Sequence, residues 1–439
     1  MTSGFALQCP VCGSAKETEL GRSLGIARCE SCDSPLVPRL AGLGGAPDLS
    51  PREVARILCG GGEPISLGEG GTPLVPLRSD PTVLAKLEGS NPTGTFIDRG
   101  SAVLATVLRA RGIERIVVAS LGDLGVSAST YARRAGLSCT VYTTSITPYS
   151  KIYQAALLAE RVFVASSYAE ALQRARRAER PGCALVSADH HLLLAGYETI
   201  LYEARRSFGS SFKTIVVPLG DGALLAALYA ASLELREPAT FVCARGSRES
   251  PLLRDVRVEE PLFGSLVEKI VNELGGLVVE VSEDEVLEAV STAARSEGLL
   301  LDASGATVFA AMQRVPDLKR PALVVATGGP RSDPLALWLA AKLREQHGGL
   351  PVEFIESLGF TKMRILEVLA TRGPAHPYAA WRALRSSCGL DVSLRTVYQH
   401  FEELQKMGLV ECKYDESSAR RRKLCEATRR GLEALLRSL

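Results

Sequence analysis

The chain has 439 residues, of which 46% are hydrophobic and 23% charged, and its formal net charge is only +2. A chain of this size and composition can bury a sizeable core and should divide into two to four domains. Its longest mostly apolar run, residues 222–233, has about half of the roughly 20 residues that cross a bilayer, and Met1 does not begin a signal-peptide pattern. These features argue against membrane-spanning and secreted proteins and predict a cytoplasmic one.

Eleven cysteines without a secretion signal argue against a disulfide framework and favour metal binding or ordinary burial. Four of them form two Cys-x-x-Cys pairs at the spacing of a zinc ribbon: Cys9, Cys12, Cys29 and Cys32. Four thiolates would fill the tetrahedral shell of one Zn²⁺ and leave no open position for chemistry. We therefore predict a structural zinc site within residues 1–40 and expect the other seven cysteines in the core.

Residues 41–350 form the predicted main body. A Gly- and Pro-rich linker, residues 39–63, carries one short helix over 51–58. From about residue 82 to 348, strand-like apolar runs alternate with amphipathic helices, which is typical of a largely parallel α/β fold with ligand sites at the carboxyl ends of its strands. The predicted strands are 116–119, 140–143, 161–164, 215–218, 240–244 and 322–326.

Two of these strands run through glycine-rich turns into helices, at 120–125 and 218–223. Backbone amides at such helix N-termini can bind an anion. A short glycine turn is also the ordinary connection between a strand and a helix, so the two turns alone do not establish a ligand site.

An ordered series of motifs resembles the threonine synthases. The entry motif is LGEGGTPL at 67–74, and the motif that carries the cofactor lysine in that family corresponds to KLE at 86–88 and NPTGTFIDRG at 91–100. Further matches are 272–276, 281–285, 296–298 and 326–329. The resemblance implies a two-lobed fold type II pyridoxal-phosphate enzyme body, and an N-terminal zinc ribbon is also found in that family.

The departures from this resemblance lie at the chemistry. Ile97 stands where the family has the lysine that binds pyridoxal phosphate covalently, and a side chain without an amine cannot do so. Asp123 and Asp221 replace asparagines of the family, and each puts a carboxylate where an anion would bind. Such a carboxylate could instead cap the helix N-terminus itself.

The candidate ligand-binding residues carried over from the motifs are Thr72, Asn91, Thr93, Thr95, Arg99, Ser120, Gly122, Asp123, Gly220, Asp221, Gly222 and Thr327. We expect no catalytic residue among them and no covalently bound pyridoxal phosphate. The cleft would hold the cofactor non-covalently, or a different small ligand such as an amino acid, or nothing at all while it serves as a dimerisation scaffold.

Residues 351–439 read as a winged helix-turn-helix domain that resembles PadR-type proteins. They hold 15 Lys and Arg against 11 Asp and Glu. Two helical stripes, with Ile365, Leu366 and Leu369 and then with Ala379, Trp381 and Leu384, precede a helix over 394–407 whose Leu394, Val397, Phe401 and Leu404 share one face. Two strands, 409–414 and 420–425, and a helix over 428–439 follow.

In such a domain the third helix reads base edges and the wing contacts phosphates. The candidate DNA-binding residues are Ser393, Arg395, Thr396, Tyr398, Gln399, His400, Arg420, Arg421, Arg422 and Lys423. A winged helix used for protein contact is the alternative for this region.

These features together predict an α/β body with a small zinc ribbon and a winged helix-turn-helix domain. The function expected from them is a homodimeric transcription regulator that binds double-stranded DNA, and whose inactive body senses a small effector from amino-acid metabolism. Two alternatives remain. One is a pyridoxal-phosphate-dependent lyase similar to threonine synthase that uses Lys86, Lys151 or another lysine, and the other is a DNA-binding adaptor with a silent body.

Overall fold

The computed structural model describes residues 5–18, 27–40, 49–247, 250, 252–258, 260–333, 359–388, 390, 392–415 and 422–436. The chain divides into two compact units, residues 1–350 and 351–439, and each is described by itself. Within the described ranges, no helix combines the length and the apolar character needed to cross a membrane.

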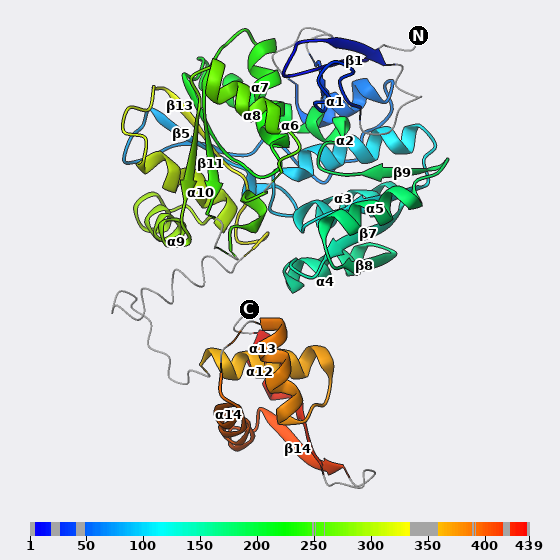
Figure 1. Ribbon diagram of the computed structural model, residues 1–439, viewed down its shortest axis with the longest axis vertical. Helices are drawn as coiled ribbons and strands as arrows, with labels where there is room; N and C mark the ends of the chain where they lie inside the picture. Colours follow the sequence, from blue (N-terminus) through cyan, green and yellow to red (C-terminus); the bar gives the residue numbers. More distant parts are fainter. Residues whose placement is uncertain are drawn as a thin grey trace. The chain divides into compact units, whose positions relative to one another are not determined.

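The N-terminal arm of the first unit is a three-stranded antiparallel sheet in the order β2-β1-β3 (Figure 1). Its strands are β1 (Phe5–Gln8), β2 (Ala15–Thr18) and β3 (Val37–Pro38). Leu7 and Val37 are buried in the same apolar core as the main body, so the arm packs as part of this unit. The predicted helix that follows, α1 (Pro51–Leu58), begins where Ser50 accepts a hydrogen bond from the Glu53 amide.

One lobe of the body is built on a four-stranded parallel sheet in the order β8-β7-β6-β9. Its strands are β6 (Arg115–Ala119), β7 (Ser138–Thr144), β8 (Arg161–Ala165) and β9 (Cys183–Val186). The helices packed on it are α3 (Asp123–Ala135), α4 (Tyr149–Leu158) and α5 (Tyr168–Ala178).

The other lobe is built on a six-stranded sheet in the order β12-β11-β10-β13-β5-β4, parallel except for β4. Its strands are β4 (Leu74–Pro76), β5 (Val83–Leu87), β10 (Thr214–Pro218), β11 (Thr240–Gly246), β12 (Leu277–Val281) and β13 (Ala322–Ala326). Helix α10 (Ala303–Gln313) packs across β10 to β13 and is preceded by α9 (Glu283–Thr292), as Figure 1 shows. Helices α7 (Ala223–Glu234) and α8 (Gly264–Glu273) complete this lobe.

Two long helices, α2 (Ile97–Ala110) and α6 (His191–Phe208), pack against each other in the middle of the unit. Their backbones approach so closely that a Cβ on Gly196 would lie 2.3 Å from the Arg99 carbonyl oxygen. Three short helical turns occur along the body: η2 (Glu88–Ser90), η3 (Arg254–Val256) and a π-helical turn, η4 (Ala293–Glu297). The six strands predicted from the sequence are therefore present, and β4, β5, β9 and β12 are additions to them.

The second unit consists of α12 (Phe360–Arg372), α13 (Pro377–Cys388), α14 (Leu394–Lys406), β14 (Val410–Asp415), β15 (Arg422–Ala427) and α15 (Arg429–Leu436). Its core contains the predicted Ile365, Leu366, Leu369, Leu384, Val397, Phe401 and Leu404. Ala379 is exposed, because the buried stripe of α13 runs through Ala380 and Ala383 instead. Leu394 is only half-buried, since it is the first residue of its helix.

Two cysteines expected as single core residues form a disulfide, Cys412–Cys425. The antiparallel register of β14 and β15 places them directly opposite each other, with their Cα atoms 4.0 Å apart. The expectation that the cysteines outside the arm are unpaired is therefore wrong for this pair, because the sequence does not reveal the strand register.

Candidate functional site

The four cysteines of the arm converge as predicted. Their sulfur atoms all lie within 4.8 Å of one another, on two matching turns in which the Gly13 and Asp33 amides bond back to the first cysteine of each pair. Gly13 and Asp33 both adopt positive φ, which closes the two turns tightly. The cluster of Cys9, Cys12, Cys29 and Cys32 has the donor set and the spacing to hold a tetrahedral metal ion.

A second cluster is a buried ion network between β5, α2 and α6. Arg99, fully buried, binds Glu88 through Nε at 2.6 Å and Glu203 through Nη2 at 2.7 Å, and Lys86 Nζ lies 3.0 Å from Glu203. Burial alone would raise the pKa of Glu203, but Arg99 and Lys86 lower it to about 2. Two cations thus balance two carboxylates, and the network is a structural element of the fold.

The network accounts for several residues that were candidates for ligand binding. Thr72 donates to Glu88 at 2.7 Å, Asn91 Nδ2 donates to the same carboxylate at 2.8 Å, and Arg99 also contacts Thr199. Thr93 binds Asp98 through both its amide and its hydroxyl at 2.6 Å. The polar atoms of these side chains are therefore engaged inside the protein.

The turn after β6 holds a different group. Ser120 Oγ accepts from the amides of Gly122 at 2.9 Å and Gly125 at 2.8 Å, which fixes the turn at the start of α3. Gly122 has a φ of 155°, and a Cβ there would lie 3.3 Å from the Lys151 side chain. The turn therefore presents Asp123, the first residue of α3, to Lys151 on α4.

Lys151 is the only lysine amine in the described residues that reaches this turn. Its Nζ forms an ion pair with Asp123 and a 2.9 Å hydrogen bond to Ser332 Oγ, which itself lies 3.0 Å from Asp123. The Lys151 side chain is 2% exposed, whereas that of Asp123 is 23% exposed. Burial lowers the pKa of Lys151, but Asp123, Asp255 and Asp302 outweigh this effect and raise it well above its ordinary value.

Further carboxylates surround this amine. Asp302 caps α10 through the Gly305 amide at 2.7 Å and lies against Gly328, and burial raises its pKa to about 7. Asp255, in η3, is exposed by its accessible surface but has many protein atoms around its carboxylate. The resulting desolvation raises its pKa to about 6. Among the described residues here, the carboxylates Asp123, Asp255, Asp302 and Asp333 outnumber the cations Lys151 and Arg254.

The turn after β10 adjoins this group, because the Asp255 carbonyl oxygen would lie 2.4 Å from a Cβ on Gly220. Asp221 Oδ1 accepts from the Ala223 amide at 2.9 Å and so caps α7. Gly222 packs against Phe263, which would lie 2.9 Å from a Cβ at that position. Burial, with a smaller contribution from Asp189, raises the pKa of Asp221 to about 6.

Ile97 begins α2 beside the same turns. The preceding Phe96 donates its amide to the Thr327 carbonyl oxygen at 3.0 Å and packs its ring against Tyr197 at 4.8 Å. Thr95 pairs with Gly328, next to Asp302. The motifs at 95–97, 120–125, 220–222 and 327–332 therefore meet in one region at the carboxyl ends of the strands, as the resemblance implied.

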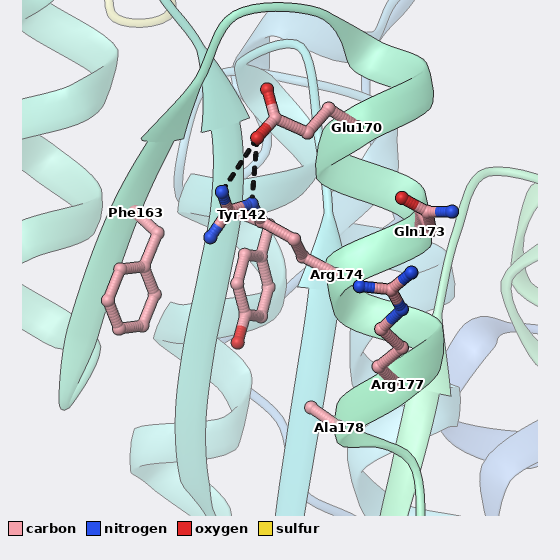
Figure 2. A pocket seen from close by; sticks show the side chains of 7 residues that line it. All are labelled: Tyr142, Phe163, Glu170, Gln173, Arg174, Arg177 and Ala178. Carbon is pink, nitrogen blue, oxygen red and sulfur yellow. Dashed lines mark hydrogen bonds and ion pairs between the residues drawn. The ribbon is translucent and has the colours of Figure 1, made fainter.

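A hollow lies elsewhere, beside β7, β8 and α5, with a volume of about 490 Å³. Figure 2 shows that it is lined by Tyr142 and Phe163, whose rings stack at 5.1 Å, and by the ion pair of Glu170 and Arg174. It contains no buried amine or nucleophile, so we place the candidate site at Lys151.

In the second unit, α14 presents Arg395, Tyr398 and Gln399 to solvent, with Thr396 and His400 half-buried beside them. Ser393 caps the helix through the Thr396 amide at 3.1 Å, and Lys423 Nζ donates to Gln405 at 3.2 Å. Arg420 and Arg421 lie outside the described residues, as does the side chain of Arg422. The candidate DNA contacts that can be located lie on α14 and β15.

A sequence model of the family described as pyridoxal-phosphate dependent enzyme matches residues 65–328. The chain belongs to this family. Threonine synthase of Mycobacterium leprae (strain TN) is 27% identical over 314 residues, covering 62% of this chain and 84% of that protein. Threonine synthase of Halalkalibacterium halodurans is 25% identical over 300 residues, covering 62% and 85%.

Solved structures share the fold of the body. The processed form of threonine deaminase isoform 2 from Solanum lycopersicum matches with a TM-score of 0.52 at 18% identity, covering 62% of this chain and 87% of that chain. A fungal L-serine ammonia-lyase from Rhizomucor miehei matches with a TM-score of 0.52 at 19% identity, covering 62% and 98%. The fold type II body implied by the motifs is confirmed.

The same findings overturn the expected function. A transcription regulator with a catalytically inactive body is contradicted by membership of an enzyme family and by relatives that are threonine synthases. The absence of a lysine at Ile97 was the reason for that expectation. One substituted position is weak evidence of inactivity when a buried lysine, Lys151, lies where the same motifs meet.

The family implies pyridoxal phosphate, and the cleft fits only part of it. Lys151 supplies a buried amine, and Thr327 and Ser332 supply hydroxyl groups at the end of β13, which suit an aldehyde and a pyridine ring. The turn at 220–222 does not fit the phosphate, since the Asp221 carboxylate already takes the Ala223 amide and places a like charge where the phosphate would lie.

Sequence reasoning missed Asp255, Asp302 and Ser332 and named Lys151 only as one possible amine. Asp302 reads as an ordinary helix N-cap, and nothing local marks Asp255. The available signal for Lys151 was a lone lysine near the start of an otherwise uncharged helix, α4. A lysine in such a place is often buried with a partner.

Proposed function

We propose that this chain is an amino-acid lyase of the threonine-synthase type in which Lys151, rather than residue 97, supplies the reactive amine. The observation that carries the proposal is the burial of Lys151 Nζ between Asp123 and Ser332 where the family motifs meet. An aldehyde cofactor of the pyridoxal type supplies an electron sink for negative charge on the amino acid.

The residues of the cleft have separate tasks in this proposal. Lys151 Nζ holds a proton, and after losing it can accept one from a substrate carbon. Asp123 and Ser332 orient that nitrogen, because both contact it and each other. Asp123 also keeps the amine charged, so the neutral form needed for attack becomes more abundant as the pH rises.

Reductive labelling tests this assignment without requiring turnover. The full-length protein is incubated with pyridoxal or its phosphate and treated with borohydride, which fixes the aldehyde to the amine it has met, and the labelled peptide is mapped. We expect the label on Lys151 and its loss in Lys151→Arg, which keeps the charge but not the amine. Lys319→Met, at an exposed site, is the matched control and should keep the label.

Label on Lys86, or spread evenly over surface lysines, would overturn the role of Lys151. Lys86 is a poor alternative because its amine already contacts Thr72 and Glu203. Turnover of O-phosphohomoserine, threonine and serine is then measured with the unchanged protein. Labelling at Lys151 without turnover of any of them would contradict the lyase assignment.

We also propose that the cysteine cluster holds structural zinc. The support is the four-sulfur donor set on two tight turns. Metal analysis of the purified protein should find one zinc per chain, and a chelator should lower the melting temperature. A metal content near zero with an unchanged melting temperature would contradict it.

For the second unit we propose a winged helix-turn-helix fold, supported by three helices followed by a two-stranded hairpin and a last helix. Double-stranded DNA remains the partner that this fold would suit, and homodimerisation remains a prediction. Loss of DNA retention on Arg395→Ala, with Arg372→Ala as a control, would support that partner, and absence of retention at low salt would contradict it.

A further inference from the structure

The β10–α7 turn carries a carboxylate of its own at the helix N-terminus. Asp221 Oδ1 takes the Ala223 amide at 2.9 Å, so a carboxylate already occupies part of the helix N-terminus. Other segments pack closely on both glycines of the turn, since a Cβ on Gly220 would meet the Asp255 carbonyl oxygen at 2.4 Å and one on Gly222 would meet Phe263 at 2.9 Å. The Asp255 carbonyl oxygen thus adds another electronegative atom beside the turn.

A second carboxylate lies near the turn, because Asp189 is close enough to raise the pKa of Asp221, whereas the cations Lys151 and Arg254 act on Asp255. A phosphate dianion here would therefore meet like charges in a partly desolvated place, which is an arrangement that proteins use to reject a ligand. A neutral hydroxyl group would instead find a hydrogen-bond acceptor in Asp221.

We propose that Asp221 selects an unphosphorylated ligand, so that the aldehyde compound used by this cleft carries an uncharged hydroxymethyl group where its phosphate ester would be. This selection rests on the proposed function, because Lys151 would bind the aldehyde of the ligand and Asp221 would bind the hydroxymethyl group at its other end. Asp221 is the specificity-determining residue. Its carboxylate oxygen would accept a hydrogen bond from the ligand's hydroxyl group, where a phosphate site would instead offer backbone amides.

Pyridoxine and pyridoxine 5′-phosphate isolate this end of the ligand. Neither has an aldehyde, so binding of the pair to the full-length protein does not depend on Lys151. Calorimetry at pH 8 should show at least about tenfold tighter binding of pyridoxine, equivalent to about 1.4 kcal/mol. Asp221→Asn keeps the helix cap, because asparagine also accepts from the Ala223 amide, but removes the charge.

We expect Asp221→Asn to strengthen phosphate-ester binding by at least about tenfold and to change pyridoxine binding by less than about threefold. Asp317→Asn removes a charge from the exposed surface and should change neither. Tighter binding of the phosphate ester by the unchanged protein, or no response to Asp221→Asn, overturns the selection.

The reductive label separates the two proposals. If neither pyridoxine compound binds while pyridoxal still labels Lys151, the selection by Asp221 is wrong and the role of Lys151 stands. If pyridoxine binds with the expected preference but no aldehyde labels Lys151, the selection stands and the proposed amine is wrong.

Discussion

Two of the buried charged clusters in the first unit differ in balance. In the network of Lys86, Glu88, Arg99 and Glu203, two cations meet two carboxylates at direct contact distances. Around Lys151, one cation meets Asp123 directly and the carboxylates of Asp255 and Asp302 at longer range. A balanced cluster is complete without a ligand, whereas an unbalanced one retains charge that a ligand or proton can satisfy.

The largest expected effect comes from unbalancing the first cluster. Arg99→Met leaves Glu88 and Glu203 buried with only Lys86 to compensate them, and we expect a loss of about 3–5 kcal/mol in the free energy of unfolding. Urea denaturation measures it. Arg174→Met breaks an exposed ion pair and should leave the midpoint unchanged within error. A loss below about 1 kcal/mol in Arg99→Met would show that the network is not structural.

The buried carboxylates of the first unit should respond to pH in opposite directions. The pKa of Asp302 is raised to about 7 and that of Asp98 to about 6, both chiefly by burial, so the folded protein binds these protons more tightly and gains stability as the pH falls from 7. The pKa of Glu203 is lowered to about 2, so its contribution is lost as the pH falls below about 4.5.

We therefore expect the urea midpoint to pass through a maximum near about pH 5. Asp302→Asn removes one of the groups responsible for the rise and should flatten the limb between pH 7 and 5. A midpoint that falls steadily from pH 7 to pH 4 in the unchanged protein would contradict the raised pKa values of the buried aspartates.

The smallest expected effect concerns the pairing of Lys151. Asp123→Asn removes the nearest carboxylate but keeps an acceptor, so the pKa of the Lys151 amine should fall toward its ordinary value. The pH dependence of aldehyde labelling should shift to lower pH, so that labelling at pH 8 becomes faster. Ser332→Ala, which removes only a neutral partner, should shift it less, and an equal shift would show that charge is not the cause.

The sequence predicted the parts of the fold that depend on local patterns. Buried strands such as β10 and β13 are continuous apolar runs between turn residues, and Ser50 and Ser393 mark the helices they cap. β5 was missed because Lys86 interrupts its apolar run, although the lysine is buried by partners distant in the sequence. β12 was missed because it is half-exposed.

The candidate site was less predictable because its members come from separate elements. The motifs located the turns at 120–125 and 220–222, but the partners of Lys151 lie up to 181 residues away in the sequence. Arg99 and Asn91 lie within a motif and yet serve the fold, so membership of a motif did not separate ligand contacts from structural ones. That distinction depends on which side chains are already paired.

The N-terminal arm has a consequence for anyone who wishes to shorten this chain. Helix α7 is buried along ten of its twelve residues, and part of its cover is β3 of the arm, where Val37 joins the same apolar cluster. Deleting the first 40 residues would remove the four cysteines and expose apolar surface of α7. The shortened protein would aggregate through this exposed surface. A low yield of it would therefore reflect the exposed apolar surface and not a loss of catalytic residues.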